Sequence, residues 1–374
     1  MRTGRRVAVV LFLGVGLAAA PGFVRGWRLP PLQWDPAPEP TRLDGGSTAP
    51  SVRAEGAYLV AHDGPRLRWR AFTPEPVLHV SNPTDVPVEV VVENVHPEAT
   101  DAEFAAAAQH GLERRWLVPA GAADLVLAPT FPVRDRYRVA ALGDTGGGGE
   151  LDAFLEAAAA AGADFVLHLG DFAYGPGELA AAAEAVRRSA VPVYAAIGNH
   201  DFHRGLELLH RGFTRNVGPR NWAFRLGGVE FVNLDTAADT WPPDSGERGR
   251  LVAALLAAPR GRTAATVLLT HRPIVDPRGR GHDLGRAGER AWMREVVAAL
   301  GADLLLHGHV HASLESVLDG VPVFVAGGGL GRGADEVPEE GPVFLMLSWR
   351  PDPAPHLAAR WLPLPEPSRT GSPR

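Results

Sequence analysis

Five short motifs, each directly after an apolar run, constrain this chain more than any other feature of its sequence. The runs have the length of buried strands, so each motif falls where a strand ends. In open α/β sheets, sites are built at that edge. The sequence therefore predicts that the motifs meet there. They are Gly143-Asp144-Thr145-Gly146, Gly170-Asp171-Phe172-Ala173-Tyr174, Gly198-Asn199-His200-Asp201, His271 within Leu268 to Pro273, and Gly308-His309-Val310-His311.

The polar side chains of these motifs are typical metal ligands. Asp, Asn, His and Tyr are hard or borderline ligands that suit iron, zinc or manganese. Two ions about 3.5 to 4 Å apart can hydrolyse a phosphoester by holding the attacking and the leaving oxygen. Ordinary helix capping by Asp144 or Asp171 would explain one motif. The ordered series instead predicts a two-metal hydrolytic site.

The series resembles the calcineurin-like metallophosphoesterases and, within them, the purple acid phosphatases. The superfamily opens on Asp-x-His, but Gly146 stands at the histidine position, so one ligand is missing. Purple acid phosphatases have glycine there and supply a tyrosine from the second motif, where this chain has Tyr174. The resemblance covers roughly residues 137 to 330. It implies an α/β fold, a four-layer αββα sandwich, for the catalytic domain at 137–363.

The resemblance also implies a ligand set for two ions. Asp171 resembles the bridging carboxylate. The two remaining sets are Asp144, Tyr174 and His311 for the first ion, and Asn199, His271 and His309 for the second. A phenolate and two carboxylates suit Fe(III), whereas two imidazoles and an amide suit a divalent ion such as Zn, Fe(II) or Mn. A packing role for the Tyr174 ring is the alternative.

The same resemblance assigns residues to the substrate. A metal-bound hydroxide attacks the phosphorus, so no covalent enzyme intermediate is needed. His200 touches the phosphate or protonates the leaving alkoxide, and Asp201 orients it. His282, in the loop Arg278 to Asp283, and His203 are candidate substrate contacts, with a solvated loop as the alternative.

Two histidines inside strands are predicted to be structural. His168 lies an odd number of residues from Asp171, so it faces the other side of its strand. His307 shares its parity with His309, but the ligand set is complete without it.

Composition narrows the class of protein. The chain has 374 residues, 45% of them hydrophobic, which is enough for two domains with sizeable cores. It contains neither cysteine nor lysine, which excludes disulfides, thiolate ligands and a catalytic lysine. The formal net charge of -6 argues against a nucleic-acid partner. A small phosphorylated substrate is the expected partner, and the oligomeric state stays open.

The amino terminus has the pattern of an export signal. Arg2, Arg5 and Arg6 precede the apolar run Val7 to Ala20. That run is shorter than the roughly 20 residues of a spanning helix. We therefore expect a signal peptide or an N-terminal anchor at 1–26, with a possible membrane tether, and an exported protein. A Pro-rich linker is expected at 27–55.

The remaining regions flank the catalytic domain. Short alternating segments separated by turns predict a small all-β, immunoglobulin-like domain at 56–132. Glu98 to Gln109 has the composition of an inserted helix, and a disordered tail is expected at 364–374.

Within the catalytic domain, regular elements alternate between helix and strand. Trp222 to Leu226 and Val229 to Leu234 read as a hairpin, and antiparallel strands are expected after the last motif. The expected helices are Glu150 to Ala161, Glu178 to Arg188, Arg248 to Ala258 and Arg286 to Leu300.

Three functions are consistent with these patterns. The first is an exported, acid phosphatase-like phosphomonoesterase. The second is a phosphodiesterase on the same dimetal core, which the motifs cannot distinguish from the first. The third is an inactive surface binding protein, which should have lost ligands, whereas this chain retains the full set.

Overall fold

The computed structural model describes residues 41–101, 104–133, 135–201, 211–238, 242–258, 263–351 and 356–367, all within one compact unit. The predicted signal or anchor, the linker up to residue 40, His203 and the tail after residue 367 lie outside this part of the chain. Among the described residues, no helix is both long enough and apolar enough to cross a membrane.

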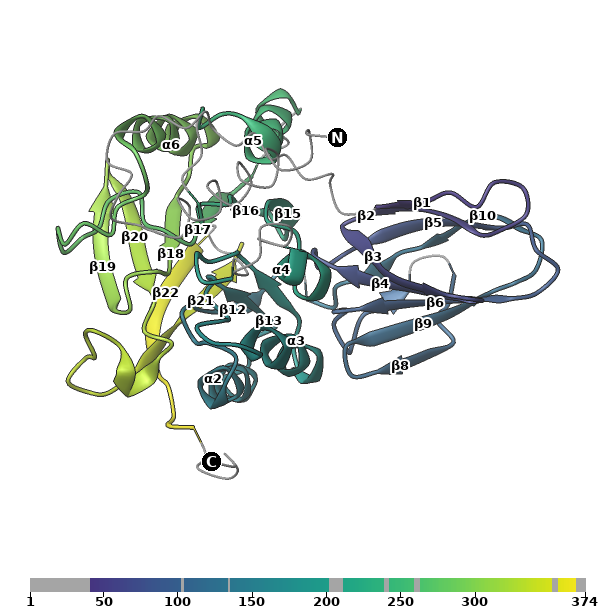
Figure 1. Cartoon of the computed structure of the whole chain (residues 1–374), viewed down its shortest axis with the longest axis horizontal. Coiled ribbons are helices and arrows are strands. Elements are labelled where there is room, and N and C mark those ends of the chain that lie inside the picture. Colours follow the sequence, from purple (N-terminus) through teal and green to yellow (C-terminus); the bar gives the residue numbers. More distant parts are fainter. Residues whose placement is uncertain are drawn as a thin grey trace, which may run out of the picture. The chain divides into compact units, whose positions relative to one another are not determined.

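The first third of the described chain is a β-sandwich (Figure 1). Two sheets, in the orders β1-β2-β5-β10 and β3-β4-β6-β9-β8, enclose one apolar core that contains the fully buried Trp69 and Trp116. Strands β4 and β6 pair in parallel, while most other pairs are antiparallel. Its immunoglobulin-like classification stays a prediction. The strands are β1 Arg42–Leu43, β2 Ser51–Glu55, β3 Ala57–Asp63, β4 Arg66–Ala71, β5 Val77–Asn82, β6 Val88–Glu93, β7 Thr100–Asp101, β8 Ala108–His110, β9 Glu113–Val118, β10 Ala122–Leu127 and β11 Pro129–Thr130.

The predicted inserted helix at 98–109 is wrong for the described residues of that segment. They contain β7, which pairs with β11, and β8, which pairs with β9. The Asp101 carboxylate accepts hydrogen bonds from the Ala106 N–H and from Arg114. These contacts override the local helix propensity of the alanines, which is only a weak preference.

The sandwich also begins earlier than the predicted linker boundary. Strand β2 lies inside the segment assigned to the linker, and it pairs with β5 from Ser51↔Ser81 to Glu55↔Val77. Val52 and Ala54 are buried in the sandwich core. Proline and glycine between residues 45 and 50 therefore mark a turn that leads into the sheet.

The region from residue 137 onward contains two further sheets, in the orders β14-β13-β12-β21-β22 and β15-β16-β17-β18-β20-β19. In the first sheet β14, β13 and β12 are parallel, and β21 and β22 add antiparallel pairs. In the second sheet β16, β17, β18 and β20 are parallel, with antiparallel strands at both edges. The strands are β12 Tyr137–Leu142, β13 Phe165–His168, β14 Val193–Ala195, β15 Trp222–Leu226, β16 Val229–Asn233, β17 Ala265–Thr270, β18 Leu304–His307, β19 Ser313–Leu318, β20 Val321–Ala326, β21 Val343–Arg350 and β22 His356–Pro363.

The helices match the four expected ones closely, and a short helix is added. The Gly227-Gly228 hairpin also forms as expected, since β15 and β16 pair antiparallel. The helices are α2 Gly149–Ala160, α3 Glu178–Arg188, α4 Arg211–Asn216, α5 Gly246–Ala257 and α6 Ala287–Leu300, with the 3-10 turn η1 at Gly331–Gly333.

Three apolar cores stack these elements. Helices α2 and α3 pack on the outer face of the first sheet around Phe154, and α5 and α6 pack on the second around Met293. Between the sheets lies a core centred on Phe165, whose ring contacts those of Tyr194 and Phe231. Strands covered on both faces need apolar residues at every position, which explains their continuous apolar runs.

The strand register brings the motifs to one edge. In the first sheet Leu142 pairs with His168, and His168 pairs with Ala195, so three motifs leave the sheet at nearly the same level. In the second sheet Thr270 pairs with His307, which aligns the last two motifs. The expectation that the motifs share a sheet edge is confirmed within each sheet.

Candidate metal centre

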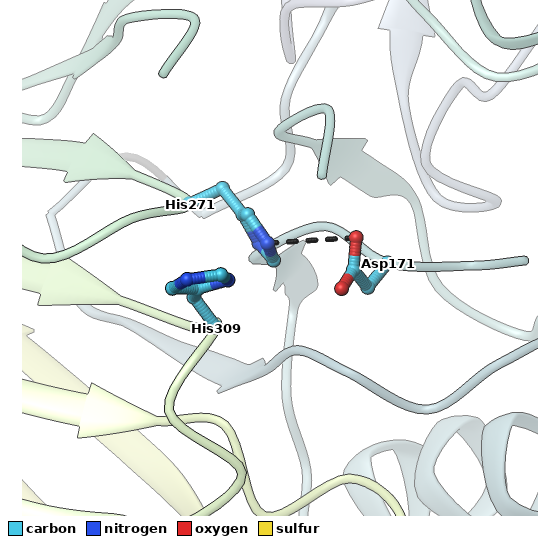
Figure 2. A group of neighbouring side chains, drawn as sticks. All are labelled: Asp171, His271 and His309. Carbon is cyan, nitrogen blue, oxygen red and sulfur yellow. Dashed lines mark ion pairs between the residues drawn. The ribbon is translucent and has the colours of Figure 1, made fainter. Parts of the chain in front are cut away.

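Carboxylates and imidazoles from both sheets converge in two groups. The ligand atoms of Asp144, Asp171 and His311 lie within 4.8 Å of one another, as do those of Asp171, His271 and His309. Figure 2 shows the second group, in which His271 is paired with the Asp171 carboxylate and the His309 ring lies beside the His271 ring. Asp171 is common to both groups, which is the arrangement that a bridging carboxylate requires.

The Asp171 carboxylate has one satisfied oxygen and one unsatisfied oxygen. Its Oδ1 accepts the His200 N–H at 2.8 Å and lies 3.4 Å from His271 Nε2. Its Oδ2 is buried and has no hydrogen-bond partner among the described residues. A buried polar atom left unpaired costs about 1 to 3 kcal/mol, more if charged. The donor set therefore fits a metal ion, which would satisfy this oxygen.

Tyr174 completes the first group. Its hydroxyl lies 3.4 Å from Asp144 Oδ1 and 3.2 Å from His311 Nε2. The other oxygen of Asp144 accepts the His309 N–H at 2.8 Å. The phenol oxygen therefore faces the same point as the carboxylate and the imidazole, which a purely packing ring need not do.

Asn199 completes the second group. Its Oδ1 lies 3.0 Å from His271 Nε2. His271 donates its Nδ1–H to the Leu169 carbonyl at 2.8 Å, so that Nε2 is the nitrogen directed at the site. Backbone contacts of this kind fix the ring orientation of metal-binding histidines.

The backbone of the site is unusual. Seven described non-glycine residues have positive φ, and four of them belong to the two groups. The four are Asp144 at 63°, Asp171 at 61°, His309 at 68° and His311 at 39°. Each such residue costs on the order of 1 kcal/mol or more, and this strain concentrates at functional sites.

Glycines allow the motif loops to approach one another. A Cβ on Gly198 would lie 2.1 Å from Asp171 Oδ1, and one on Gly308 would lie 2.7 Å from Asp144 Oδ2. Gly170 has φ +99°, and a Cβ there would meet His271 Nδ1 at 2.6 Å. Side chains at these positions would displace the candidate ligands.

The carboxylates and imidazoles perturb one another strongly. Burial raises the pKa of Asp144 well above its ordinary value, and Asp171 adds to that rise. Burial lowers the pKa of His271, but the Asp171 carboxylate outweighs burial and raises it to about 9. Burial also raises the pKa of Asp171, but the charge of His271 outweighs burial and holds that pKa below its ordinary value. Burial lowers the pKa of His309 to about 3.

Asp201 holds the motif loops and differs from its expected role. Its carboxylate accepts the backbone N–H groups of Asp171, Phe172 and Gly198 at 2.7 to 3.0 Å. The His200 ring is not among the hydrogen-bond partners that the structure gives to this carboxylate. The side chain of His200 is exposed, with its ring 4.6 Å from that of Tyr174. Asp201 therefore positions the loops of the second and third motifs.

The remaining histidines separate into two kinds. His282 lies beside the second group, with its ring 5.4 Å from that of His309. His168 and His307 are buried and bonded to Thr145 and Thr270, in agreement with their predicted structural roles. The second candidate substrate contact, His203, lies outside the described residues.

Two acidic residues near the site were missed from the sequence. Glu178 Oε2 accepts the Tyr174 N–H at 2.6 Å, and Asp276 organises the loop that contains His282. Each had a local signal. Glu178 begins a helix, where acidic residues are favoured, and Asp276-Pro277-Arg278-Gly279 has the composition of a turn.

Comparison with known proteins shows what the region around the site is similar to. Residues 137–313 match the sequence profile of the calcineurin-like phosphoesterases. No curated protein matches the chain. Similar solved structures include PhoD, at 14% identity and a TM-score of 0.47 over 77% of this chain and 87% of that one. A dimetal phosphatase from Danio rerio is similar at 12% identity and a TM-score of 0.42, over 60% of this chain and 95% of that one. GAP50, the anchor in the inner membrane complex of Plasmodium, is similar at 14% identity and a TM-score of 0.44, over 63% of this chain and 86% of that one.

We expect Gly198→Ala to abolish metal loading, because the new methyl group would overlap Asp171 Oδ1. Gly218→Ala is the matched control, since nothing lies within 4 Å of a Cβ built there. Elemental analysis of both purified variants measures the effect. Full metal content in Gly198→Ala would show that the Asp171 loop does not hold the ions.

Metal affinity of the metal-free chain should rise with pH up to about 9. Below that pH His271 carries a proton that a bound ion must displace, because its pKa is raised to about 9. Asp144, with its raised pKa, acts in the same direction. One displaced proton corresponds to roughly a tenfold gain in affinity per pH unit. Calorimetric titration with Mn(II) in buffers of different ionisation enthalpy measures the proton release, and pH-independent affinity below pH 9 would contradict it.

Proposed function

Because residues 137–313 match the profile of the calcineurin-like phosphoesterases, we propose that this chain hydrolyses phosphomonoesters at two metal ions held by seven side chains. The observation that carries the proposal is the buried Oδ2 of Asp171, which no described residue pairs with and which lies where the two ligand groups meet. The helix–sheet–sheet–helix packing supports the four-layer αββα architecture of the resembling enzymes.

Seven side chains would hold the ions, with Asp171 shared between them. Asp144, Tyr174 and His311 would hold the first ion, and Asn199, His271 and His309 the second. Bound ions of this kind polarise the phosphoryl oxygens and lower the pKa of water. The chain itself supplies the orientation. Leu169 directs Nε2 of His271, and Asp201 fixes the loops that carry Asp171 and Gly198.

His200 is suited to the proton transfer. Its backbone N–H is fixed by Asp171 Oδ1, while its ring is exposed next to Tyr174. A side chain at the open edge of the ligand groups can meet the leaving oxygen of a bound ester. We therefore assign it as general acid or phosphate contact, as the resemblance implies.

Tyr174 supports the purple acid phosphatase subtype. Burial, together with Asp144 and Asp171, raises the pKa of the Tyr174 hydroxyl far above its ordinary value. Only a strongly Lewis-acidic ion would remove that proton, which favours Fe(III) at the first position and a divalent ion at the second. The place left open by Gly146 is lined by Tyr174 and Glu178 instead of a histidine.

We further propose that the protein is exported, as the pattern at Arg2 to Ala20 indicates. This segment lies outside the described residues, so the proposal depends on composition alone. Fractionation of the native cell tests the export proposal, and recovery of the protein from the cytosol would contradict it.

His200→Ala should retain both metal ions but lose roughly 10² to 10⁴ in rate with an alkyl phosphate. The loss should be smaller with p-nitrophenyl phosphate, whose leaving group needs no proton. His110→Ala, an exposed histidine of the sandwich, is the control. Equal losses with both substrates would make His200 a phosphate contact and not an acid.

The same assay separates the alternative functions. Faster turnover of bis(p-nitrophenyl) phosphate than of the monoester would favour the phosphodiesterase. A chain that binds two ions and turns over neither substrate would be the inactive binding protein.

Iron-loaded, oxidised protein should show a visible phenolate-to-iron charge-transfer band that Tyr174→Phe removes. Tyr194→Phe should keep it, because the Tyr194 hydroxyl is buried in the core between the sheets and has no hydrogen-bond partner in the described part of the chain. Absorption spectra of the three proteins at equal iron content make the comparison. A band that survives in Tyr174→Phe would leave this tyrosine outside the ligand set.

A further inference from the structure

The loop Asp276–Asp283, between β17 and α6, lies next to the second ligand group. Its His282 ring is 5.4 Å from the His309 ring, which is itself 5.1 Å from the His271 ring. The loop contains Gly279 and Gly281, both with positive φ. A segment with two such glycines is conformationally free unless other contacts hold it.

The carboxylate of Asp276 supplies those contacts. Its Oδ1 accepts the Arg278 N–H at 3.0 Å, and its Oδ2 accepts the N–H groups of Arg280 at 3.1 Å and His282 at 3.3 Å. The Asp276 N–H in turn donates to Asp283 Oδ1 at 2.6 Å. The side chain is buried. One carboxylate therefore fixes the backbone of the loop at three points, including His282 itself.

Arginine side chains connect this loop to the segment Asp335–Glu336, here called the strap. The Arg278 guanidinium is 6% exposed and lies 3.5 Å from Asp335 Oδ2 and 3.7 Å from Glu336 Oε1. Arg280 pairs with the same Glu336 oxygen at 2.7 Å. The Asp335 N–H donates to the His311 carbonyl at 2.9 Å. The connection thus runs from His282, beside the second group, to His311 in the first.

We propose that Asp276 is a positioning residue that holds His282 against the second ligand group, where its imidazole contacts a phosphoryl oxygen of the substrate, and that Arg278 secures this loop to the strap. The proposal rests on the proposed phosphoesterase function. The sequence already makes His282 a candidate substrate contact. The new part is the role of Asp276, whose carboxylate holds the loop through three backbone N–H groups and the Arg278 side chain.

A set of variants tests the proposal in the metal-loaded full chain with p-nitrophenyl phosphate. Asp276→Ala and His282→Ala should each raise KM about tenfold, with unchanged metal content, as expected for loss of a hydrogen bond to a charged group. The double variant should be no worse than either single one, because both changes remove the same contact. Asp276→Asn, which keeps an acceptor oxygen, should recover part of the loss.

Asp319→Ala is the matched control. Asp319 is likewise an aspartate in a turn, but it pairs with Arg294 on the surface. Its KM should equal that of the wild type. An unchanged KM in Asp276→Ala, or multiplicative effects in the double variant, would overturn the proposal. If Asp276→Ala does not fold, Arg278→Gln replaces it, with the same expected rise in KM and the same contradicting result.

Binding of inorganic phosphate to the metal-loaded proteins separates this proposal from the proposed function. Phosphate affinity should fall about tenfold in Asp276→Ala and in His282→Ala, independently of turnover. In one outcome the wild type binds phosphate without turnover, and both variants lose affinity for phosphate. This result would contradict the proposed function and support the positioning role. If the wild type and both variants are active and bind phosphate equally well, the proposed function is supported and the positioning role is contradicted.

Discussion

The carboxylate of Asp171 is the constraint on which the rest of the site depends. It is buried at the end of β13, with one oxygen held by the His200 N–H and the other unpaired. A bound cation would satisfy the unpaired oxygen, and the surroundings of Asp171 leave it free to bind one. Asp201 holds its backbone, and the absence of a side chain at Gly198 leaves room for it. Four residues of the ligand groups have positive φ, and the surrounding contacts must offset the free-energy cost of these backbone conformations.

Much of the catalytic fold could be predicted because its strands are buried on both faces. Such strands appear as continuous apolar runs, as Phe165–His168 does, and the polar residues that follow them mark the edge of the sheet. Residue parity correctly separated His168 from the ligands, since one-dimensional alternation determines which face a strand residue occupies. The convergence of Asp144, Tyr174 and His311 required the resemblance to a known family, because they come from distant motifs.

What could not be predicted depends on contacts between segments far apart in the chain. The Ala-rich stretch before His110 resembles a helix locally, but pairing with β9 and β11 decides its conformation. Asp201 follows His200 in sequence, which suggested a direct partnership, whereas its oxygens bond to the loop of another motif. The three bonds accepted by Asp276 are local in sequence, but only coordinates show that the loop lies beside His309.

Each ligand group takes residues from both sheets. In the first, Asp144 follows β12 and His311 follows β18. In the second, Asp171 follows β13, while His271 follows β17. An ion bound in either group is therefore a cross-link between the sheets, and it closes a loop that spans much of the catalytic domain. Closing long loops reduces the entropy of the unfolded chain, so occupancy would join the two sheets into one cooperative unit. In a chain without cysteine, the bound metal ions would thus provide the cross-links that disulfides provide in other proteins.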